Sequence, residues 1–211
     1  MTIPENVADW TLQTVVDIVT QHAFETGSFD FKEVLNPSKG QGSDEHAKSI
    51  RRTACSFANT DGGFIIFGVQ DPRQEPSKAV GELIVGIPDG DLRKDLGGKL
   101  AAIQPDVSFE TVPRGIPIPS RQGRVVFIAQ IPLSPRRPHI YEGYFYRRGA
   151  GGAAEHMNVY EVREQMLNTE ERLRKLTLLR LEILQFLLMA REFRVSSRKV
   201  WEEGRRAMAA H

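Results

Sequence analysis

The feature of this sequence that most constrains its fold is a helix-breaking turn followed at once by an apolar run. The turn, Asn-Thr-Asp-Gly-Gly, occupies residues 59–63, and Phe-Ile-Ile-Phe-Gly-Val follows at 64–69. A strand that is apolar on both faces must be covered on both sides, so the run predicts a central strand of a sheet. Before the turn, apolar residues recur at helical spacing, and Ser43 followed by two acids is typical of a helix start. We therefore expect a helix over 43–58 that the turn ends.

The rest of the first 150 residues alternates between the two periodicities. Helical spacing predicts further helices over 8–23 and 91–103. Strands are expected over 24–34, 84–87, 107–112, 125–131 and 144–149. Together these elements predict an α+β fold, with a mixed sheet and helices packed on it.

The C-terminal part differs in kind. Asn158 and Thr169 are candidate helix caps, and the helix after Thr169 is expected to run to about Arg191. Ser196 or Ser197 would cap a final basic helix. Between Leu173 and Leu188 the leucines cover more than one stripe, which indicates burial on two sides. We expect a domain over 1–168 and a helical extension over 169–211 that serves oligomerisation or partner docking.

Composition excludes several classes of protein. Hydrophobic residues make up 40% of the 211 and charged residues 26%, which is too apolar for disorder, and one Cys cannot form a disulfide framework. No apolar run approaches the roughly 18 residues of a membrane span, and the N-terminus lacks signal-peptide character. We expect a cytoplasmic protein without membrane contact. The net charge of +1 is uninformative about nucleic acid.

Three acidic residues and a lysine are the candidates for chemistry. Glu25, Asp30 and Asp71 lie at or near strand ends, and Lys32 shares a strand face with Asp30 because side chains alternate. Carboxylates can hold Mg²⁺ or Mn²⁺ for phosphodiester cleavage, and a lysine can stabilise charge that develops on the phosphate. The alternative is that these acids are ordinary solvated groups and that Lys32 protects a sheet edge.

A longer pattern bears on this choice. It consists of Phe-Asp-Phe-Lys-Glu at 29–33 and Ala-Cys-Ser-Phe-Ala-Asn-Thr-Asp-Gly-Gly-Phe-Ile-Ile-Phe-Gly-Val-Gln-Asp at 54–71. Ile-Gln-Pro at 103–105, Arg-Pro-His at 137–139 and Tyr-Phe-Tyr-Arg-Arg-Gly at 144–149 follow in order. Over about residues 20–165 the chain resembles the Schlafen AlbA_2 family.

This resemblance implies an α+β fold and nucleic-acid binding. Animal members of the family include endoribonucleases that cut tRNA and rRNA with three acidic residues, which match Glu25, Asp30 and Asp71. These would be the ligands of Mg²⁺ or Mn²⁺, with Lys32 at the phosphate. The family's usual Glu is Asp30 here, which draws the carboxylate back by roughly 1.5 Å. An ATPase role is not expected, since no phosphate-binding loop precedes a helix.

Several basic residues are candidates for contacts with the nucleic-acid backbone. They are Lys39, Lys48, Arg51, Arg136, Arg137, Arg147 and Arg148. The two Arg-Arg pairs stand among Pro, His and Tyr, as backbone clamps with stacking partners do. For Arg52 we favour a solvated helix face. His139 and Cys55 are expected to be structural.

The leading hypothesis is a nucleic-acid-binding protein with divalent-metal-dependent endonuclease activity, on RNA such as tRNA rather than DNA. The alternatives are a non-catalytic DNA- or RNA-binding regulator and a protein-interaction adaptor. Because animal relatives carry two such lobes in one chain, we also expect a homodimer through the C-terminal helices and the domain body.

Overall fold

The computed structural model describes residues 4, 6–21, 27–37 and 43–209 of the chain. Two compact units divide it, Met1–Gln165 and Met166–His211, and each is described by itself. The helices are η1 (Val7–Asp9), α1 (Leu12–Gln21), α2 (Ser43–Asn59), α3 (Val80–Leu83), α4 (Leu92–Leu100) and α5 (Val159–Ala209). The strands are β1 (Phe29–Lys32), β2 (Gly63–Phe67), β3 (Ile87–Pro88), β4 (Glu110–Thr111), β5 (Ile116–Pro117), β6 (Arg124–Ile131), β7 (Ile140–Tyr141), β8 (Tyr144–Arg148) and β9 (Ala154–His156).

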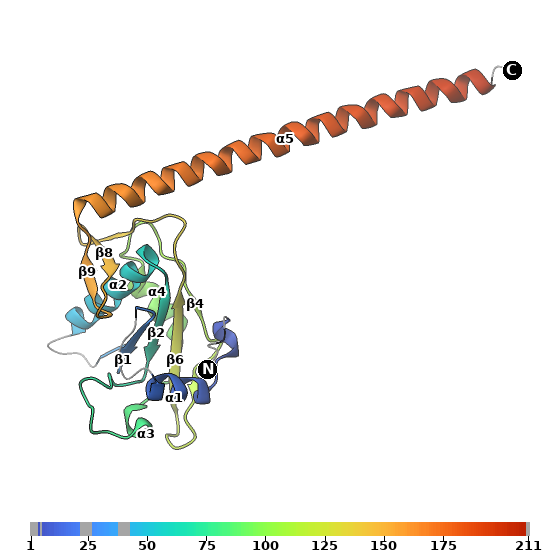
Figure 1. Cartoon of the computed structure of the whole chain (residues 1–211). Helices are drawn as coiled ribbons and strands as arrows, with labels where there is room; N and C mark the ends of the chain where they lie inside the picture. Colours follow the sequence, from blue (N-terminus) through green and yellow to red (C-terminus); the bar gives the residue numbers. More distant parts are fainter. Residues whose placement is uncertain (1–3, 5, 22–26, 38–42, 210–211) are drawn as a thin grey trace. The chain divides into compact units, whose positions relative to one another are not determined.

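The first unit is built on a mixed six-stranded sheet, which confirms the expected α+β class. Its main order is β1-β2-β6-β3, with β4 and β5 also paired to β6. Figure 1 labels β1, β2, β4 and β6 of this sheet. β2 runs parallel to β1 and antiparallel to β6. The apolar run that predicted a central strand thus forms one, between two neighbours. A second, antiparallel sheet has the order β7-β8-β9.

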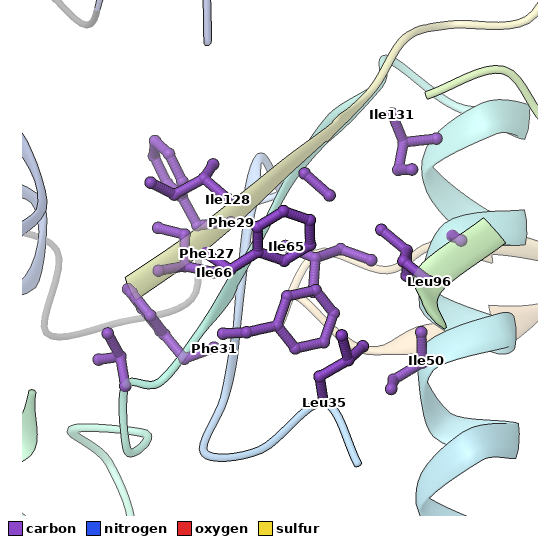
Figure 2. Close-up of a cluster of buried hydrophobic side chains, with 14 of the residues drawn as sticks. Phe29, Phe31, Leu35, Ile50, Ile65, Ile66, Leu96, Phe127, Ile128 and Ile131 are labelled. Atoms are coloured by element: carbon purple, nitrogen blue, oxygen red, sulfur yellow. The ribbon is translucent and has the colours of Figure 1, made fainter. Parts of the chain in front are cut away.

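The core lies where the sheet meets its helices. Phe29 stacks on Phe64 of the neighbouring strand, and Trp10 covers Phe64 on the same face of the sheet. The opposite face packs against α2, which also contacts β8 and β9. Figure 2 shows side chains of β1, β2 and β6 gathered with one residue each from α2 and α4: Phe29, Phe31, Ile65, Ile66, Phe127, Ile128, Ile131, Ile50 and Leu96.

The second unit consists of α5, which begins in the first. Asn158 caps this helix: its Oδ1 accepts hydrogen bonds from the backbone N–H groups of Tyr160 and Glu161. The expected break before Ser196 or Ser197 is wrong, because the helix runs unbroken to Ala209. No helix among the described residues combines the length and the apolar character that a membrane span requires.

Candidate acidic site and nucleic-acid interface

Asp30 and Lys32 lie on the same face of β1, as the alternation of a strand predicts. Lys32 Nζ is 2.8 Å from Asp30 Oδ2. Asp30 is only 4% exposed and lies on the face of the sheet that packs against α2, so its carboxylate is largely removed from water. A charge buried to this degree requires compensation from nearby groups of opposite sign.

Arg148 supplies a second positive charge to Asp30. Its side chain, 2% exposed, enters from the end of β8, and Nη1 lies 3.4 Å from Asp30 Oδ1. Nη2 donates a 2.6 Å hydrogen bond to the carbonyl oxygen of Phe29. The guanidinium also stands over the ring of Phe57, 4.5 Å from its centroid. Arg148 therefore holds a carboxylate inside the first unit, whereas the sequence suggested a contact with phosphate.

Two cations thus share one carboxylate in this cluster. Lys32, Asp30 and Arg148 together carry two formal positive charges and one negative charge. Counted over the described residues alone, this surplus charge favours an anion over a further cation beside Asp30. Of the two basic side chains, Lys32 is the more exposed and is the one that can meet solvent.

Asp71 lies beyond the end of β2. That strand ends at Phe67, which pairs with Lys32, and Asp71 follows four residues later. Its carboxylate accepts hydrogen bonds from the backbone N–H and the guanidinium of Arg73. Asp71 is therefore already engaged with a neighbouring arginine.

The described residues do not by themselves fit a divalent ion. Among them, no group of three or more His, Cys, Asp or Glu side chains could hold a metal. Glu25, the third expected ligand, lies outside the described residues. The triad of Glu25, Asp30 and Asp71 therefore stays a prediction.

Two candidate phosphate-binding residues on α2 have partners within the protein. Lys48 Nζ lies 3.3 Å from Asp44 and 3.8 Å from Glu142, and the hydrogen bond to Asp44 raises the pKa of Lys48 above its usual value. Arg51 Nε donates to the carbonyl oxygen of Lys99 at 2.9 Å, in the last turn of α4. Arg51 thereby satisfies a carbonyl at a helix C-terminus and ties two helices together.

The remaining candidates differ in how far they are engaged. Arg147 forms ion pairs with Glu155, at 2.9 Å, and Glu161, at 3.3 Å. Arg136 is exposed between β6 and β7, and the described residues give its side chain neither an ion pair nor a hydrogen bond. Arg137 beside it is half-buried. Lys39 lies outside the described residues.

The turn after α2 joins the elements of the first unit, a role that the sequence reasoning missed. Asn59 is buried, and its Nδ2 donates to the carbonyl oxygens of His139 and Tyr146 at 2.9 and 3.0 Å. Its Oδ1 accepts the backbone N–H of His139 at 2.6 Å. Thr60 Oγ1 accepts the backbone N–H of Arg148. The sequence contained one signal for this role: Asn59 ends the apolar face of the helix, and a buried amide side chain needs hydrogen-bond partners.

The same turn needs its two glycines for different reasons. Gly62 has φ +76°, and a Cβ there would lie 2.9 Å from the carbonyl oxygen of Ile131 and from the backbone nitrogen of Leu133. A Cβ on Gly63 would meet the ring of Phe57. The turn at 59–63, on which the resemblance rests, therefore has a structural role in packing and hydrogen bonding.

His139 and Cys55 are structural, as expected. His139 is fully buried and its Nδ1 lies 2.7 Å from the carbonyl oxygen of Pro105. Burial lowers the pKa of His139, and the positive charge of Arg136 adds to the effect. Burial raises the pKa of the Cys55 thiol to about 12, so it stays protonated and unreactive.

Two cavities border the start of α4. One of about 300 Å³ is lined by residues of both signs, among them Asp91, Arg93 and Arg114. The other, of about 180 Å³, shares Asp89, Gly90 and Leu92 with it. None of the residues singled out from the sequence lines either of them.

Comparison with known proteins supplies a family. The family model described as "Schlafen, AlbA_2" matches residues 25–157, which is more than half of the chain. No curated protein matches. Among solved structures, the crystal structure of the DIP2311 protein from Corynebacterium diphtheriae is similar, with 20% sequence identity and a TM-score of 0.42. The similarity covers 66% of this chain but only 23% of that one.

Proposed function

Because this chain belongs to the Schlafen AlbA_2 family, we propose that its first unit binds nucleic acid through the phosphate backbone. The observation that best supports the proposal is the charge at Asp30: one buried carboxylate faces both Lys32 and Arg148. Among the described residues this cluster keeps a surplus positive charge, and its more exposed member, Lys32, would be the one to contact a phosphate oxygen.

Arg136 is the second candidate contact on this unit. Its side chain is exposed and free of ion pairs among the described residues, so a phosphate would have no internal carboxylate to displace there. Arg147 and Lys48 would have to leave carboxylate partners first. Binding is then expected to depend more on Arg136 than on either of them.

Metal-dependent cleavage is the second candidate function. It is supported by the 2.8 Å pairing of Lys32 with Asp30, which puts a cation beside an expected metal ligand. Glu25, Asp30 and Asp71 would hold Mg²⁺ or Mn²⁺, and such an ion would supply Lewis-acid polarisation of the phosphate. Lys32 would stabilise negative charge on the phosphate oxygens. RNA such as tRNA is the favoured substrate, with DNA as the alternative.

We further propose that the chain self-associates through α5 and the domain body, with a homodimer as the smallest assembly that supplies the second lobe that one copy lacks. This part of the proposal rests on the resemblance to two-lobed relatives and on the exposed apolar residues of α5.

The test is incubation of the pure protein with tRNA, single-stranded DNA and double-stranded DNA, in Mn²⁺ or in EDTA. Retarded bands in both conditions without products support binding alone, and products only in Mn²⁺ support the nuclease. If neither retarded bands nor products appear, the proposal is overturned, and a protein-interaction adaptor is the remaining alternative.

Matched variants locate each role. Arg136→Glu is expected to weaken retardation of every nucleic acid, whereas Arg114→Glu, an exposed arginine on another loop, is expected to leave it unchanged. Asp71→Asn should abolish any Mn²⁺-dependent cleavage and spare binding. Asp61→Asn, an exposed acid in the turn after α2, is its control. Equal cleavage by both variants would remove Asp71 from the site.

A further inference from the structure

The segment 173–190 of α5 presents far more apolar surface than a solvated helix carries. Its large apolar side chains are between 46% and 67% exposed: Leu173, Leu176, Leu178, Leu179, Leu181, Ile183, Leu184, Phe186, Leu187, Leu188 and Met189. A contiguous apolar surface of this kind marks an interaction site in a soluble protein.

The distribution of these side chains around the helix says how many neighbours they need. At about 100° per residue, one arc of roughly 220° runs from Phe186 to Leu181 and is apolar at ten of its twelve positions. Thr177 and Arg180 are the other two. The Thr177 hydroxyl donates to the Leu173 carbonyl oxygen at 2.9 Å, so it needs no outside partner.

The remaining arc of segment 173–190 is mostly polar, with Leu178 and Met189 as its two apolar residues. Arg174, Lys175, Glu182 and Gln185 occupy four of its six positions, and all four side chains are exposed. Lys175 also pairs with Glu171 at 2.7 Å along the helix. This side suits solvent, so the contacts of the segment belong on the wide apolar arc.

That arc holds two rows with the alternating three- and four-residue spacing of coiled-coil seams. The first row is Leu176, Leu179, Ile183 and Phe186, and the second is Leu181, Leu184 and Leu188. At about 100° per residue the two rows point roughly 150° apart. A single neighbour covers a stripe of roughly 100°, so one partner helix can cover one row and leaves the other in water.

The buried area gives the same answer. Each large side chain offers roughly 100 Å² and is about half exposed, so the arc can bury roughly 500 Å² per chain. A dimer that used one row would bury about half of that, below the roughly 500 Å² a side of a specific interface. Contacts on both rows double the apolar area that each chain removes from water.

We propose that α5 assembles with at least two further copies of this chain, one on each row, into a bundle of three or more helices. The rows are aliphatic and similarly spaced, so each can receive a row of an identical helix, and closed symmetric assemblies use such repeated contacts. Arg180, the one charged residue of the arc within 173–190, would then fix the register, as a lone polar residue does in a coiled coil. This inference is independent of nucleic-acid binding and goes beyond a homodimer.

The test is the native mass of the full chain at micromolar concentration, by sedimentation velocity and native mass spectrometry. The expected mass is that of three or more chains. A double variant in the second row, Leu184→Glu with Leu188→Glu, is expected to leave at most dimers. The matched control, Lys175→Glu with Gln185→Glu, changes two residues of the polar arc and should keep the wild-type mass.

Two results would overturn the proposal. One is a wild-type chain that is monomeric or dimeric at these concentrations. The same result is expected if a different protein, or another part of the same chain, covers the apolar arc of α5. The other is an unchanged mass in the second-row variant while the first-row variant, Leu179→Glu with Ile183→Glu, dissociates fully. The fluorescence of Trp10, which is buried in the first unit, checks that every variant keeps its folded body.

Discussion

Replacement of Arg148 by methionine tests whether this residue is part of the fold or part of a binding surface. Methionine keeps much of the length and the apolar stem of arginine, and it removes the charge. The change deletes the 3.4 Å ion pair with Asp30 and the 2.6 Å hydrogen bond to the Phe29 carbonyl oxygen. Asp30 would then be a buried carboxylate with Lys32 as its one remaining cation in the cluster.

The expected cost follows from that burial. Removal of one partner from a buried ion pair destabilises a protein by about 3–5 kcal/mol, because the other charge stays buried. Lys32 Nζ, at 2.8 Å, still compensates Asp30, so the cost should fall near the low end, at about 3 kcal/mol. Arg147→Met is the matched control: this neighbouring side chain is 41% exposed and its ion pairs face solvent, so about 0–1 kcal/mol is expected.

The measurement is urea unfolding followed by tryptophan fluorescence in a Trp201→Phe background. Trp201 is exposed on α5, whereas Trp10 packs 4.7 Å from Phe64, so the remaining signal reports on the first unit. Adding Asp30→Asn to Arg148→Met should recover part of the loss, since it removes the unpaired charge. Equal midpoints for Arg148→Met and Arg147→Met would refute the assignment of Arg148 as a buried counter-ion.

Three further substitutions test the contacts at the C-terminal end of α2. The buried His139 has a pKa below its ordinary value, so as the pH falls the unfolded chain takes up the imidazole proton before the folded chain does. The free energy of unfolding should therefore decrease as the pH drops below about 6.5, and it should decrease less steeply in His139→Gln. Urea unfolding midpoints measured across this pH range would show the difference. Asn59→Ala strips three hydrogen bonds from buried backbone groups and should cost about 3 kcal/mol in the same unfolding assay. Gly63→Ala drives a Cβ into the ring of Phe57 and should lower the thermal midpoint by calorimetry, whereas Gly98→Ala, with open space around it, should leave the midpoint unchanged or raise it.

Much of the first unit could be predicted from local pattern. The expected helix over 43–58 is observed as Ser43–Asn59, and the expected strand over 125–131 as Arg124–Ile131. Both succeed because the hydrophobic period and the end signals agree within each segment. The expected strand over 107–112 shrinks to Glu110–Thr111, since pairing with β6 decides which residues of an extended segment join the sheet.

The predicted break in the C-terminal helix is wrong, and the sequence itself contains the physical reason why α5 continues. Ser196 and Ser197 were given the role of a cap, yet no Gly or Pro occurs between residues 153 and 203. Serine in a helix interior costs only a few tenths of a kcal/mol, roughly, so a cap residue without a breaker does not end a helix. The absence of breakers was the stronger signal.

The role of Arg148 was out of reach of local pattern, because its partner Asp30 is 118 residues away in the sequence. An arginine at the end of a strand is usually solvated, and only the docking of β8 on α2 buries this one. The error has a chemical consequence. The cluster that the sequence presented as separate acidic and basic sites is one ion network, in which the acid is already compensated.

The aspartate at position 30, where the resemblance implies a glutamate, is consistent with the ion pairs to Lys32 and Arg148. A glutamate would carry its carboxylate roughly 1.5 Å further from β1, away from the position that Lys32 and Arg148 now share. The shorter side chain therefore suits an internal counter-ion. A metal ligand would need the carboxylate to exchange these two cations for a divalent ion, and the loss of both ion pairs would oppose that exchange. For this chain the two ion pairs of Asp30 thus favour the proposed phosphate contact over the proposed metal site.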